Sequence, residues 1–207
     1  MSVTLALVII TGLISYQAFT NPAMKAKLLH RPVEEHRDKE YYRLLTHGFI
    51  HADWTHLLIN MYVLYMFGEM VERYFTHSMG GMKGRMAYLF MYLATIVAAS
   101  LYTHFKHKNN PYYAALGASG ATSGIMFAFA LFDPWAILLL FFILPCPAIV
   151  AAVLYLVYSS WASKNSRDNI GHDAHFWGAV FGFLFTIALN PPFFSQFMDR
   201  LVNDMPF

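Results

Sequence analysis

Residues 117–132 read GASGATSGIMFAFALF, a glycine-rich opening followed by an apolar run without a charged side chain. From Ser119 to Phe132 the run would form about 21 Å of helix at 1.5 Å per residue. If Asp133 marks one membrane interface, Ser119 lies roughly 10 Å below the other in a hydrocarbon core of about 30 Å. The first N–H groups of a helix have no partner in lipid, so a helix beginning there must start inside protein or beside water. The stretch therefore predicts a short, buried helix with a polar start.

The rest of the chain has the composition of a membrane protein. Of its 207 residues, 57% are hydrophobic and 13% are charged, roughly half the charge of an average soluble domain. Such a chain is not disordered, and a net charge of +2 provides no basic field for nucleic acid. Cys146 is the only cysteine, which excludes a disulfide framework and a cysteine metal cage. We expect the lipid bilayer as a partner and no nucleic acid.

Six apolar segments predict an all-α integral membrane protein with six transmembrane helices in one domain over residues 1–207. A spanning helix needs about 20 mainly apolar residues. The first segment lacks the basic start and cleavage site of a signal peptide, so we expect it to be retained. The long connection over residues 21–53 mixes acidic, basic and aromatic residues and predicts folded structure on the membrane surface. The expected helices cover residues 2–20, 54–72, 86–104, 119–132, 135–158 and 174–190.

Polar side chains stand at the starts of three alternate helices. His56 and Asn60 are four residues apart and share one face of the second helix. Ser119 opens the fourth helix and His175 the sixth. Even-numbered helices of a six-helix serpentine all start on the same side of the membrane, so the three sets share one membrane face. Because ionisable and polar groups inside a membrane are expensive, they indicate a functional site.

Small residues can bring two of these starts together. Gly120 and Gly124 lie on one face of the fourth helix, and Gly178 and Gly182 on one face of the sixth. Small residues at four-residue spacing let helix backbones approach closely. Such packing would bring His175 within hydrogen-bond reach of Ser119, and a serine becomes a good nucleophile when a neighbouring base takes its proton. Ser123, one turn deeper, is the alternative serine, but it lacks the flanking glycine turn.

Over residues 41–190 the chain resembles the rhomboid family of intramembrane serine proteases. Four motifs occur in the family's order and with its spacing. They are Tyr42-Arg43-Leu44-Leu45-Thr46-His47 with His51 and His56-Leu57-Leu58-Ile59-Asn60, then Phe67-Gly68-Glu69-Met70-Val71-Glu72, then Gly117-Ala118-Ser119-Gly120, and finally Ala174-His175 with Gly178 and Gly182.

This resemblance implies a rhomboid-like bundle and a serine endopeptidase that cleaves transmembrane segments of membrane proteins without a cofactor or metal. Ser119 would be the nucleophile and His175 the general base, with no carboxylate as a third member. His56, Asn60 and the backbone N–H of Ser119 would form the oxyanion hole. The remaining motif residues would be structural, with the first four tying the first loop to the second helix: Arg43, His47, His51, Glu72, Gly117, Gly120, Gly178 and Gly182.

One position departs from the family pattern. Many rhomboids have a bulky aromatic residue one turn after the nucleophile, packed on the base, and this chain has Ser123 there. We expect another aromatic side chain, such as Phe127 or Trp177, to contribute to holding His175. Residues 159–173 are a candidate cap over the site, and the fifth helix is a candidate mobile wall.

Two arguments on orientation conflict. The loops on the active-site side carry more Lys and Arg than the opposite loops, which by the positive-inside rule places the site in the cytoplasm. The resemblance implies the reverse, in a bacterial inner membrane. The basic residues of the first loop are interspersed with acidic ones and belong to a folded element. Without the first loop, the two membrane sides carry equal numbers of Lys and Arg residues, so the rule favours neither orientation. We therefore expect the orientation that the resemblance implies.

Two other functions fit parts of the sequence. One is a histidine-rich membrane metalloenzyme or transporter, because imidazole groups bind zinc, copper, iron and nickel. That function leaves the Gly-Ala-Ser-Gly motif without a role. The other is a catalytically dead rhomboid-like binding protein, although both dyad residues are present. The candidate metal ligands are His47, His51, His56, His172 and His175.

Overall fold

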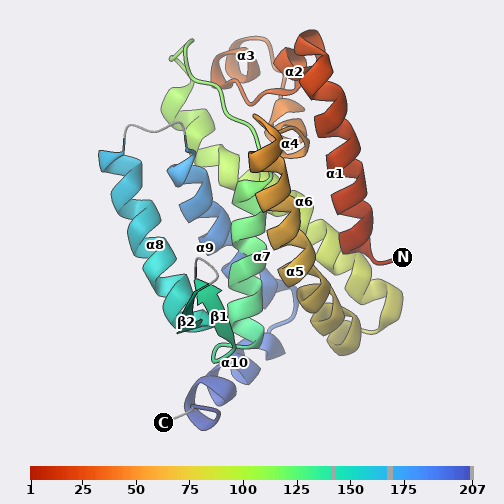
Figure 1. Cartoon of the computed structure of the whole chain (residues 1–207), viewed down its shortest axis with the longest axis vertical. Coiled ribbons are helices and arrows are strands. Elements are labelled where there is room, and N and C mark those ends of the chain that lie inside the picture. The colour runs from red at the N-terminus through yellow and green to blue at the C-terminus, as the bar shows by residue number, and fades with distance from the viewer. Residues whose placement is uncertain (141–142, 167–169, 206–207) are drawn as a thin grey trace.

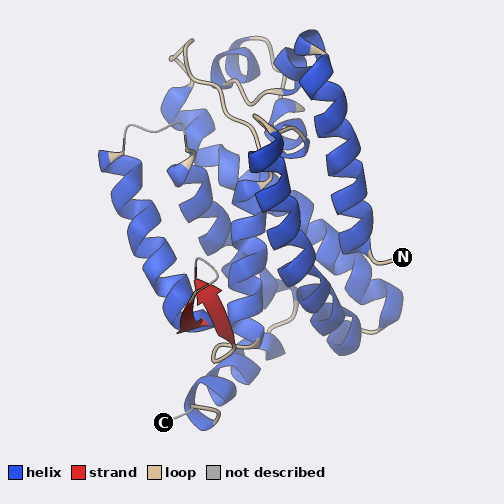
Figure 2. Cartoon of the chain, viewed as in Figure 1, coloured by secondary structure: helices blue, strands red, loops and turns tan. Residues whose placement is uncertain are grey.

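The computed structural model describes residues 1–140, 143–166 and 170–205, and these are mostly helical (Figures 1 and 2). The elements are α1 (Val3–Thr20), α2 (Pro22–Leu28), α3 (Pro32–Arg37), α4 (Arg43–Thr46), η1 (His47–Phe49), α5 (Trp54–Met79), α6 (Gly81–His107), α7 (Ser119–Phe132), β1 (Ile137–Leu140), β2 (Leu144–Pro147), α8 (Ala148–Asn165), α9 (His172–Leu189) and α10 (Pro192–Asn203).

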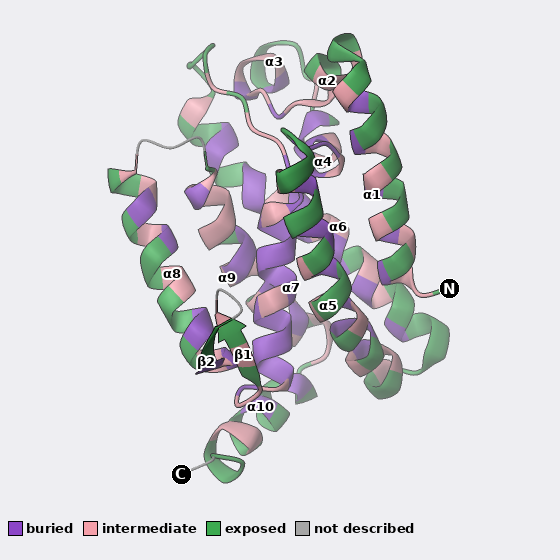
Figure 3. Cartoon of the chain, in the orientation of Figure 1, coloured by how far each residue is buried: buried purple, intermediate pink, exposed green. Residues whose placement is uncertain are grey.

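Helix α7 is the centre of the molecule. Every one of its residues except Ser119 and Met126 is buried, and the other long helices surround it (Figure 3). The sequence explains this position, because a helix that is apolar all round has no face to present to water. The starts of α5, α7 and α9 point toward the end of the bundle that carries α2 to α4, at the top of Figure 1.

The closest helix contact joins α7 and α9 through glycines. A Cβ atom built on Gly178 would lie 2.1 Å from the carbonyl oxygen of Gly120, and one on Gly182 would lie 2.3 Å from the Cα atom of Gly124. Neither distance leaves room for a side-chain carbon. The two backbones therefore touch directly, as the small residues at four-residue spacing predict.

Helix α1 is fastened to the far end of α5 by Glu72. This buried carboxylate accepts hydrogen bonds from the backbone N–H groups of Val3 and Thr4, at 2.9 and 2.8 Å, and from the Thr4 hydroxyl. The first N–H groups of a helix lack intrahelical partners, and an acidic group there also favours the helix dipole. Nε of Arg85 in α6 lies 3.8 Å from the same carboxylate. The structure thus pairs Glu72 with α1 and α6 rather than with the first loop, which corrects the expectation that it ties that loop to α5.

The first loop is folded around Arg43. Its guanidinium donates hydrogen bonds to the carbonyl oxygens of Ala26, Lys27 and Leu29, at 2.9, 2.7 and 3.0 Å. These carbonyls end α2, where they have no helical partner. The same side chain also pairs with Glu40 at 2.6 Å. Arg43 therefore holds α2 against α4.

A second buried polar cluster joins the first loop to α6. The Glu35 carboxylate lies 2.6 Å from Nδ1 of His30 and 2.6 Å from Nδ1 of His104. Nε2 of His30 is 3.0 Å from the Thr103 hydroxyl. All four side chains are buried, so each has found its polar partner inside the protein rather than in water.

The expected fifth helix over residues 135–158 is wrong in its first half. Strands β1 and β2 pair antiparallel there, with Leu138 opposite Cys146, and α8 begins only at Ala148. Pro145 and Pro147 explain the difference, because a proline inside a helix removes a hydrogen bond and clashes with the preceding turn. Residues 141–142 of the expected helix lie outside the described residues.

Other boundaries also differ from the expected ones. Helix α5 continues to Met79 and α6 starts at Gly81, after a turn in which Gly80 adopts a φ of 81°. The candidate cap over residues 159–173 is in part the end of α8 and the start of α9, and residues 167–169 lie outside the described part. The tail forms α10, bent by 113° from α9 after the Pro191-Pro192 pair.

Length and composition alone do not confirm six membrane spans. Among the described residues, α1 and α6 are long and apolar enough to cross a bilayer, and α9 with α10 would add a third span if the bent pair is counted as one. Helix α7 is apolar but has only 14 residues, too few to cross a hydrocarbon core of about 30 Å.

The close contact between α7 and α9 predicts that one methyl group added at Gly178 or Gly182 lowers the stability of the protein. Gly178→Ala or Gly182→Ala should lower the free energy of unfolding by about 1–3 kcal/mol, because the helices must separate to admit a Cβ atom. Gly12→Ala in α1 is the matched control, since its Cβ meets nothing within 4 Å. Unfolding in mixed detergent–SDS micelles, followed by circular dichroism, measures both. Equal stability of Gly178→Ala and Gly12→Ala would refute the close contact.

Candidate active site

The starts of α5, α7 and α9 meet around the glycine-rich turn before α7. A Cβ atom on Gly117 would lie 2.8 Å from Nε2 of His56, and one on Gly120 would lie 3.3 Å from the carbonyl oxygen of Ala174. The Thr122 hydroxyl lies 3.2 Å from Oδ1 of Asn60 and 3.1 Å from the carbonyl oxygen of Ser119, and its single proton is shared between these two acceptors. The structure thus brings the three sets of sequence motifs together at one place in the fold.

The turn itself requires glycine at position 117. Gly117 has a φ of 114°, a conformation that side chains strongly disfavour, and His56 occupies the space where a side chain would be. Its N–H donates to the carbonyl oxygen of His47 at 2.9 Å. Just before the turn, His30 and Ala115 exchange two backbone hydrogen bonds of 3.0 Å. The first loop therefore sets the path of the chain into α7.

His51 anchors the start of α7 to α1. Its Nε2 accepts the backbone N–H of Ala118 at 3.3 Å, so Nδ1 carries the proton and donates to the Ser15 hydroxyl at 2.9 Å. The Ser15 hydroxyl in turn donates to the carbonyl oxygen of Phe49. This hydrogen-bond chain requires a neutral imidazole. Burial, together with the nearby His56, lowers the pKa of His51 to about 3.

His47 is also held neutral. Its ring is buried beside the ring of His30, with 5.3 Å between the centroids. Burial is the main cause that lowers the pKa of His47 to about 3, and the charge of His30 acts in the same direction. The structure places both histidines in the first loop, and the structural role that the resemblance implies for them stays a prediction.

His56 directs one ring nitrogen toward the turn before α7. Asp53 caps α5 by accepting the backbone N–H of His56 at 2.8 Å. Nδ1 of His56 is 3.4 Å from the N–H of Ala52, which makes it the acceptor and leaves Nε2 as the protonated nitrogen of a neutral ring. Nε2 and the adjacent Cε1 are the ring atoms that face Gly117. A hydrogen-bond donor therefore lies against the glycine turn.

Asn60 lies one turn deeper with its amide orientation fixed on both sides. Its Nδ2 donates to the carbonyl oxygen of His56 at 2.8 Å, and its Oδ1 accepts from Thr122. An amide nitrogen has two hydrogens, so a second donor remains on Nδ2. Sequence reasoning did not identify Thr122, because a threonine inside an apolar helix carries no signal of its partner.

Ser119 and His175 each neighbour the glycine contact. Ser119 precedes Gly120, and His175 follows Ala174, whose carbonyl oxygen lies beside Gly120. Both residues are half-buried and stand in the first turns of their helices. Ser119 is at the amino end of α7, where backbone N–H groups have no helical partner. The packing thus places a hydroxyl, an imidazole and backbone donors in one region.

Tyr155 of α8 is the aromatic residue that stacks on His175. The ring centroids are 6.2 Å apart and the planes are inclined by 25°. Trp177 was expected as one alternative, but it packs on Tyr102 and is 40% exposed. Phe127 contributes indirectly, because its ring lies 6.1 Å from that of Tyr155. A tyrosine within an apolar stretch gave no sequence signal for this contact.

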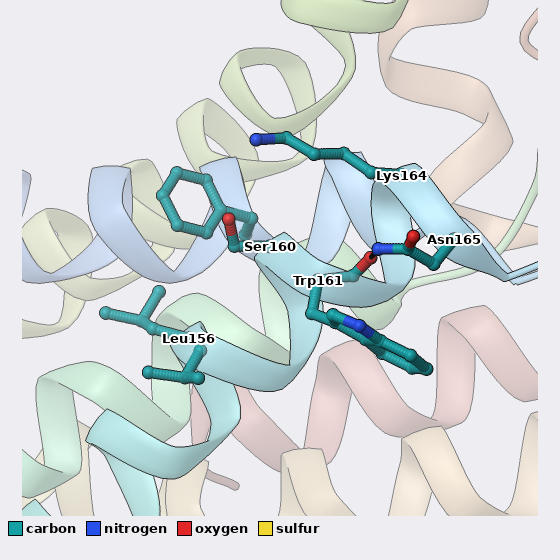
Figure 4. A pocket seen from close by; sticks show the side chains of 7 residues that line it. Leu156, Ser160, Trp161, Lys164 and Asn165 are labelled. Atoms are coloured by element: carbon teal, nitrogen blue, oxygen red, sulfur yellow. Dashed lines mark hydrogen bonds between the residues drawn. The ribbon is translucent and has the colours of Figure 1, made fainter.

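Grooves on the outside of the bundle include two lined by described residues. One, of about 440 Å³, runs along α8 beside Phe176 and is lined by Leu156, Ser160, Trp161, Lys164 and Asn165, among others (Figure 4). A larger apolar groove of about 1150 Å³ lies between α5, α7 and strand β1. Its upper end is formed by Leu58 and Ile59, which lie between His56 and Asn60 in the sequence.

The positions of the histidines do not favour the alternative function, in which these residues bind a metal ion. Within the described part of the chain, no three His, Cys, Asp or Glu side chains are grouped so that they could hold a metal ion. The ring nitrogens of His30, His51 and His104 instead contact serine, threonine, glutamate and backbone groups.

Comparison with known proteins gives the family. The model of the Rhomboid domain matches residues 38–192. The chain belongs to the rhomboid family. Rhomboid family members are typically intramembrane serine proteases, although some are inactive, and they are integral membrane proteins.

Three rhomboid relatives show the extent of the similarity. "RHOMBOID-like protein 12, mitochondrial" of Arabidopsis thaliana is 30% identical over 155 residues, 66% of this chain and 43% of that protein. "Rhomboid-like protein 11, chloroplastic" of the same plant is 28% identical over 177 residues, 81% of this chain and 59% of the relative. Rhomboid protease GlpG of Haemophilus influenzae is 38% identical over 48 residues, 23% of this chain and 25% of that protease.

The relatives correct one expectation. The chain spans about half the length of the two plant rhomboids, and their names place them in mitochondria and chloroplasts. The comparisons therefore support an integral membrane protein but not the expected bacterial inner membrane.

The neutral histidines of this rhomboid predict a loss of stability in acid. Below about pH 6.5 the unfolded chain protonates His47 and His51 while the folded chain holds them neutral, so protons favour unfolding. Between pH 6.5 and pH 4 the free energy of unfolding should fall by about 1.4 kcal/mol per pH unit for each histidine. Unfolding in mixed detergent–SDS micelles at several pH values measures the slope of the free energy of unfolding against pH.

Three variants identify the source of this slope. His47→Gln and His51→Gln should each make it shallower, and His77→Gln, at an exposed position near the end of α5, should leave it unchanged. A slope that is the same in the double variant His47→Gln/His51→Gln and in the wild type would contradict the assignment.

Proposed function

We propose that this rhomboid is an intramembrane serine endopeptidase that cleaves transmembrane segments of membrane proteins. Ser119 is the nucleophile and His175 is the general base. The observation that carries the proposal is the glycine contact between α7 and α9, which sets the residues next to Ser119 and His175 against each other. A packing role alone would not require a serine and a histidine beside this contact.

The reaction follows from these groups. Oγ of Ser119 attacks the scissile carbonyl carbon while His175 takes the hydroxyl proton, and the carbonyl oxygen becomes an oxyanion. Collapse of this intermediate expels the amine, to which His175 returns the proton, and leaves an acyl group on Ser119. A water molecule, deprotonated by His175, then hydrolyses the ester. A dyad without a carboxylate suffices for these proton transfers.

The donors near the glycine turn serve the oxyanion. Nε2 of His56, the second amide hydrogen of Asn60 and the backbone N–H of Ser119 are the proposed oxyanion hole. Fixed donors in a site shielded from bulk water stabilise the developing charge more than mobile water does. The contacts of Asp53 with His56 and of Thr122 with Asn60 support this proposal, because they hold the donors in place.

The substrate is a helix that has to unwind. An intact helix hides its carbonyl groups, so small or helix-breaking residues near the cleavage site are favoured. The apolar groove between α5, α7 and β1 suits an apolar segment that approaches from the lipid. Six membrane spans complete the proposed architecture, with α7 reaching part of the way across. The N-terminus is on the cytoplasmic side and the site opens to the opposite side.

Removal of either dyad residue should abolish cleavage. Ser119→Ala and His175→Ala should each lower the rate by about 10⁴-fold or more and leave the protein folded. Ser123→Ala is the matched control one turn away and should retain substantial activity. Cleavage of a model transmembrane substrate by the purified proteins in liposomes measures the rate. Retained cleavage by Ser119→Ala would refute the assignment, as would loss of activity in Ser123→Ala alone.

Loss of an oxyanion donor should have a graded effect. His56→Ala and Asn60→Ala should each lower kcat by about 10²- to 10³-fold, with His56 at least as important as Asn60. Tyr65→Ala, an exposed position on the same helix outside the apolar groove, is the control and should cleave normally. A chelator should not inhibit the wild type. Full activity of the double variant His56→Ala/Asn60→Ala would remove both residues from the site.

A further inference from the structure

Ser123 connects the proposed nucleophile to α8. Its Oγ lies 2.7 Å from the carbonyl oxygen of Ser119 and 2.6 Å from the hydroxyl of Tyr155. A carbonyl oxygen can only accept, so the Ser123 hydroxyl donates to Ser119 and the Tyr155 hydroxyl donates to Ser123. Two hydrogen bonds in series thus run from Tyr155 to the Ser119 backbone.

The ring of Tyr155 contacts the proposed base. Its centroid is 6.2 Å from that of His175 with the planes inclined by 25°, within the range of offset-stacked aromatic pairs. On α7, Phe127 packs against the same tyrosine ring. One side chain of α8 therefore contacts the imidazole with its face and Ser123 of α7 with its hydroxyl.

The His172 ring also lies 6.0 Å from that of His175, edge-on within the same helix α9. We propose that Tyr155, which stacks on the face of the imidazole from another helix, is a positioning residue for His175. Its ring restricts rotation of the imidazole, and packing against Phe127 of α7 holds that ring in place. The hydrogen bond to Ser123 adds a link to α7 that the ring packing does not require. The inference rests on the proposed function, in which His175 must keep one ring nitrogen on Oγ of Ser119. The terminal torsion of a histidine is broad, so a half-buried imidazole needs a packed neighbour to hold one orientation.

This arrangement makes the dyad depend on α8. Helix α8 stands at the edge of the bundle, after the β1–β2 hairpin, and much of its surface is exposed (Figures 1 and 3). Any displacement of α8 away from α9 would withdraw the Tyr155 ring from His175. The geometry of the base is thus coupled to a helix at the edge of the bundle.

Kinetics separate positioning from substrate binding. Tyr155→Leu should lower kcat by about 10- to 100-fold with little change in KM, because a misplaced base slows the chemical step. Tyr155→Phe keeps the ring and should retain most of the activity. Trp161→Leu removes an exposed aromatic residue from the same helix and should cleave like the wild type. A wild-type kcat in Tyr155→Leu, or a change in KM alone, would overturn the proposal.

A second measurement does not depend on proteolysis. In protein with ¹³C-labelled histidine rings, the His175 signal is assigned by its absence from His175→Gln. It should move in Tyr155→Leu and stay in place in Trp161→Leu. If Tyr155→Leu does not fold, Tyr155→Met removes the ring with a flexible side chain of similar length.

The two measurements distinguish the failure of each idea. If the wild type cleaves no substrate, the proposed function fails. The His175 signal then tests the contact between the Tyr155 and His175 rings without any measurement of activity. An unchanged His175 signal in the ring-removing variant would overturn the positioning role whether or not the protein is a protease.

Discussion

The direct contact between α7 and α9 is the constraint on which the rest of the structure depends. Gly120 and Gly124 meet Gly178 and Gly182 with no space for a side chain. In a bilayer, apolar side chains gain little from leaving lipid for protein, so close packing is a main source of helix association. The contact therefore both stabilises the bundle and fixes the relative position of two helix starts that carry polar groups.

Polar anchors around this contact determine where the helices begin. Arg43 closes the end of α2, Glu72 the start of α1, and Asp53 the start of α5, each by pairing with backbone groups that a helix leaves unsatisfied. His51 fastens the turn before α7 to α1. These interactions support the start of α7 inside the bundle, where unpaired backbone groups at a helix end would be expensive.

The sequence predicted what depends on local pattern and missed what depends on distant partners. Glycine spacing indicated the α7–α9 contact, and the uncharged run indicated the short buried helix Ser119–Phe132. The strands β1 and β2 were missed because an apolar run fits a helix or a strand, although two prolines argued against a helix. Tyr155 and Thr122 were missed because their contacts join helices far apart in the chain.

The most direct test is covalent labelling with a fluorophosphonate, a reagent that reacts with an activated serine. The account predicts one adduct on Ser119 in the folded wild type, located by mass spectrometry of the digested protein, and no adduct in detergent-unfolded protein or in His175→Ala. An adduct on Ser123, or equal labelling of Ser119 with and without His175, would contradict the claim that the glycine contact brings a base to this serine.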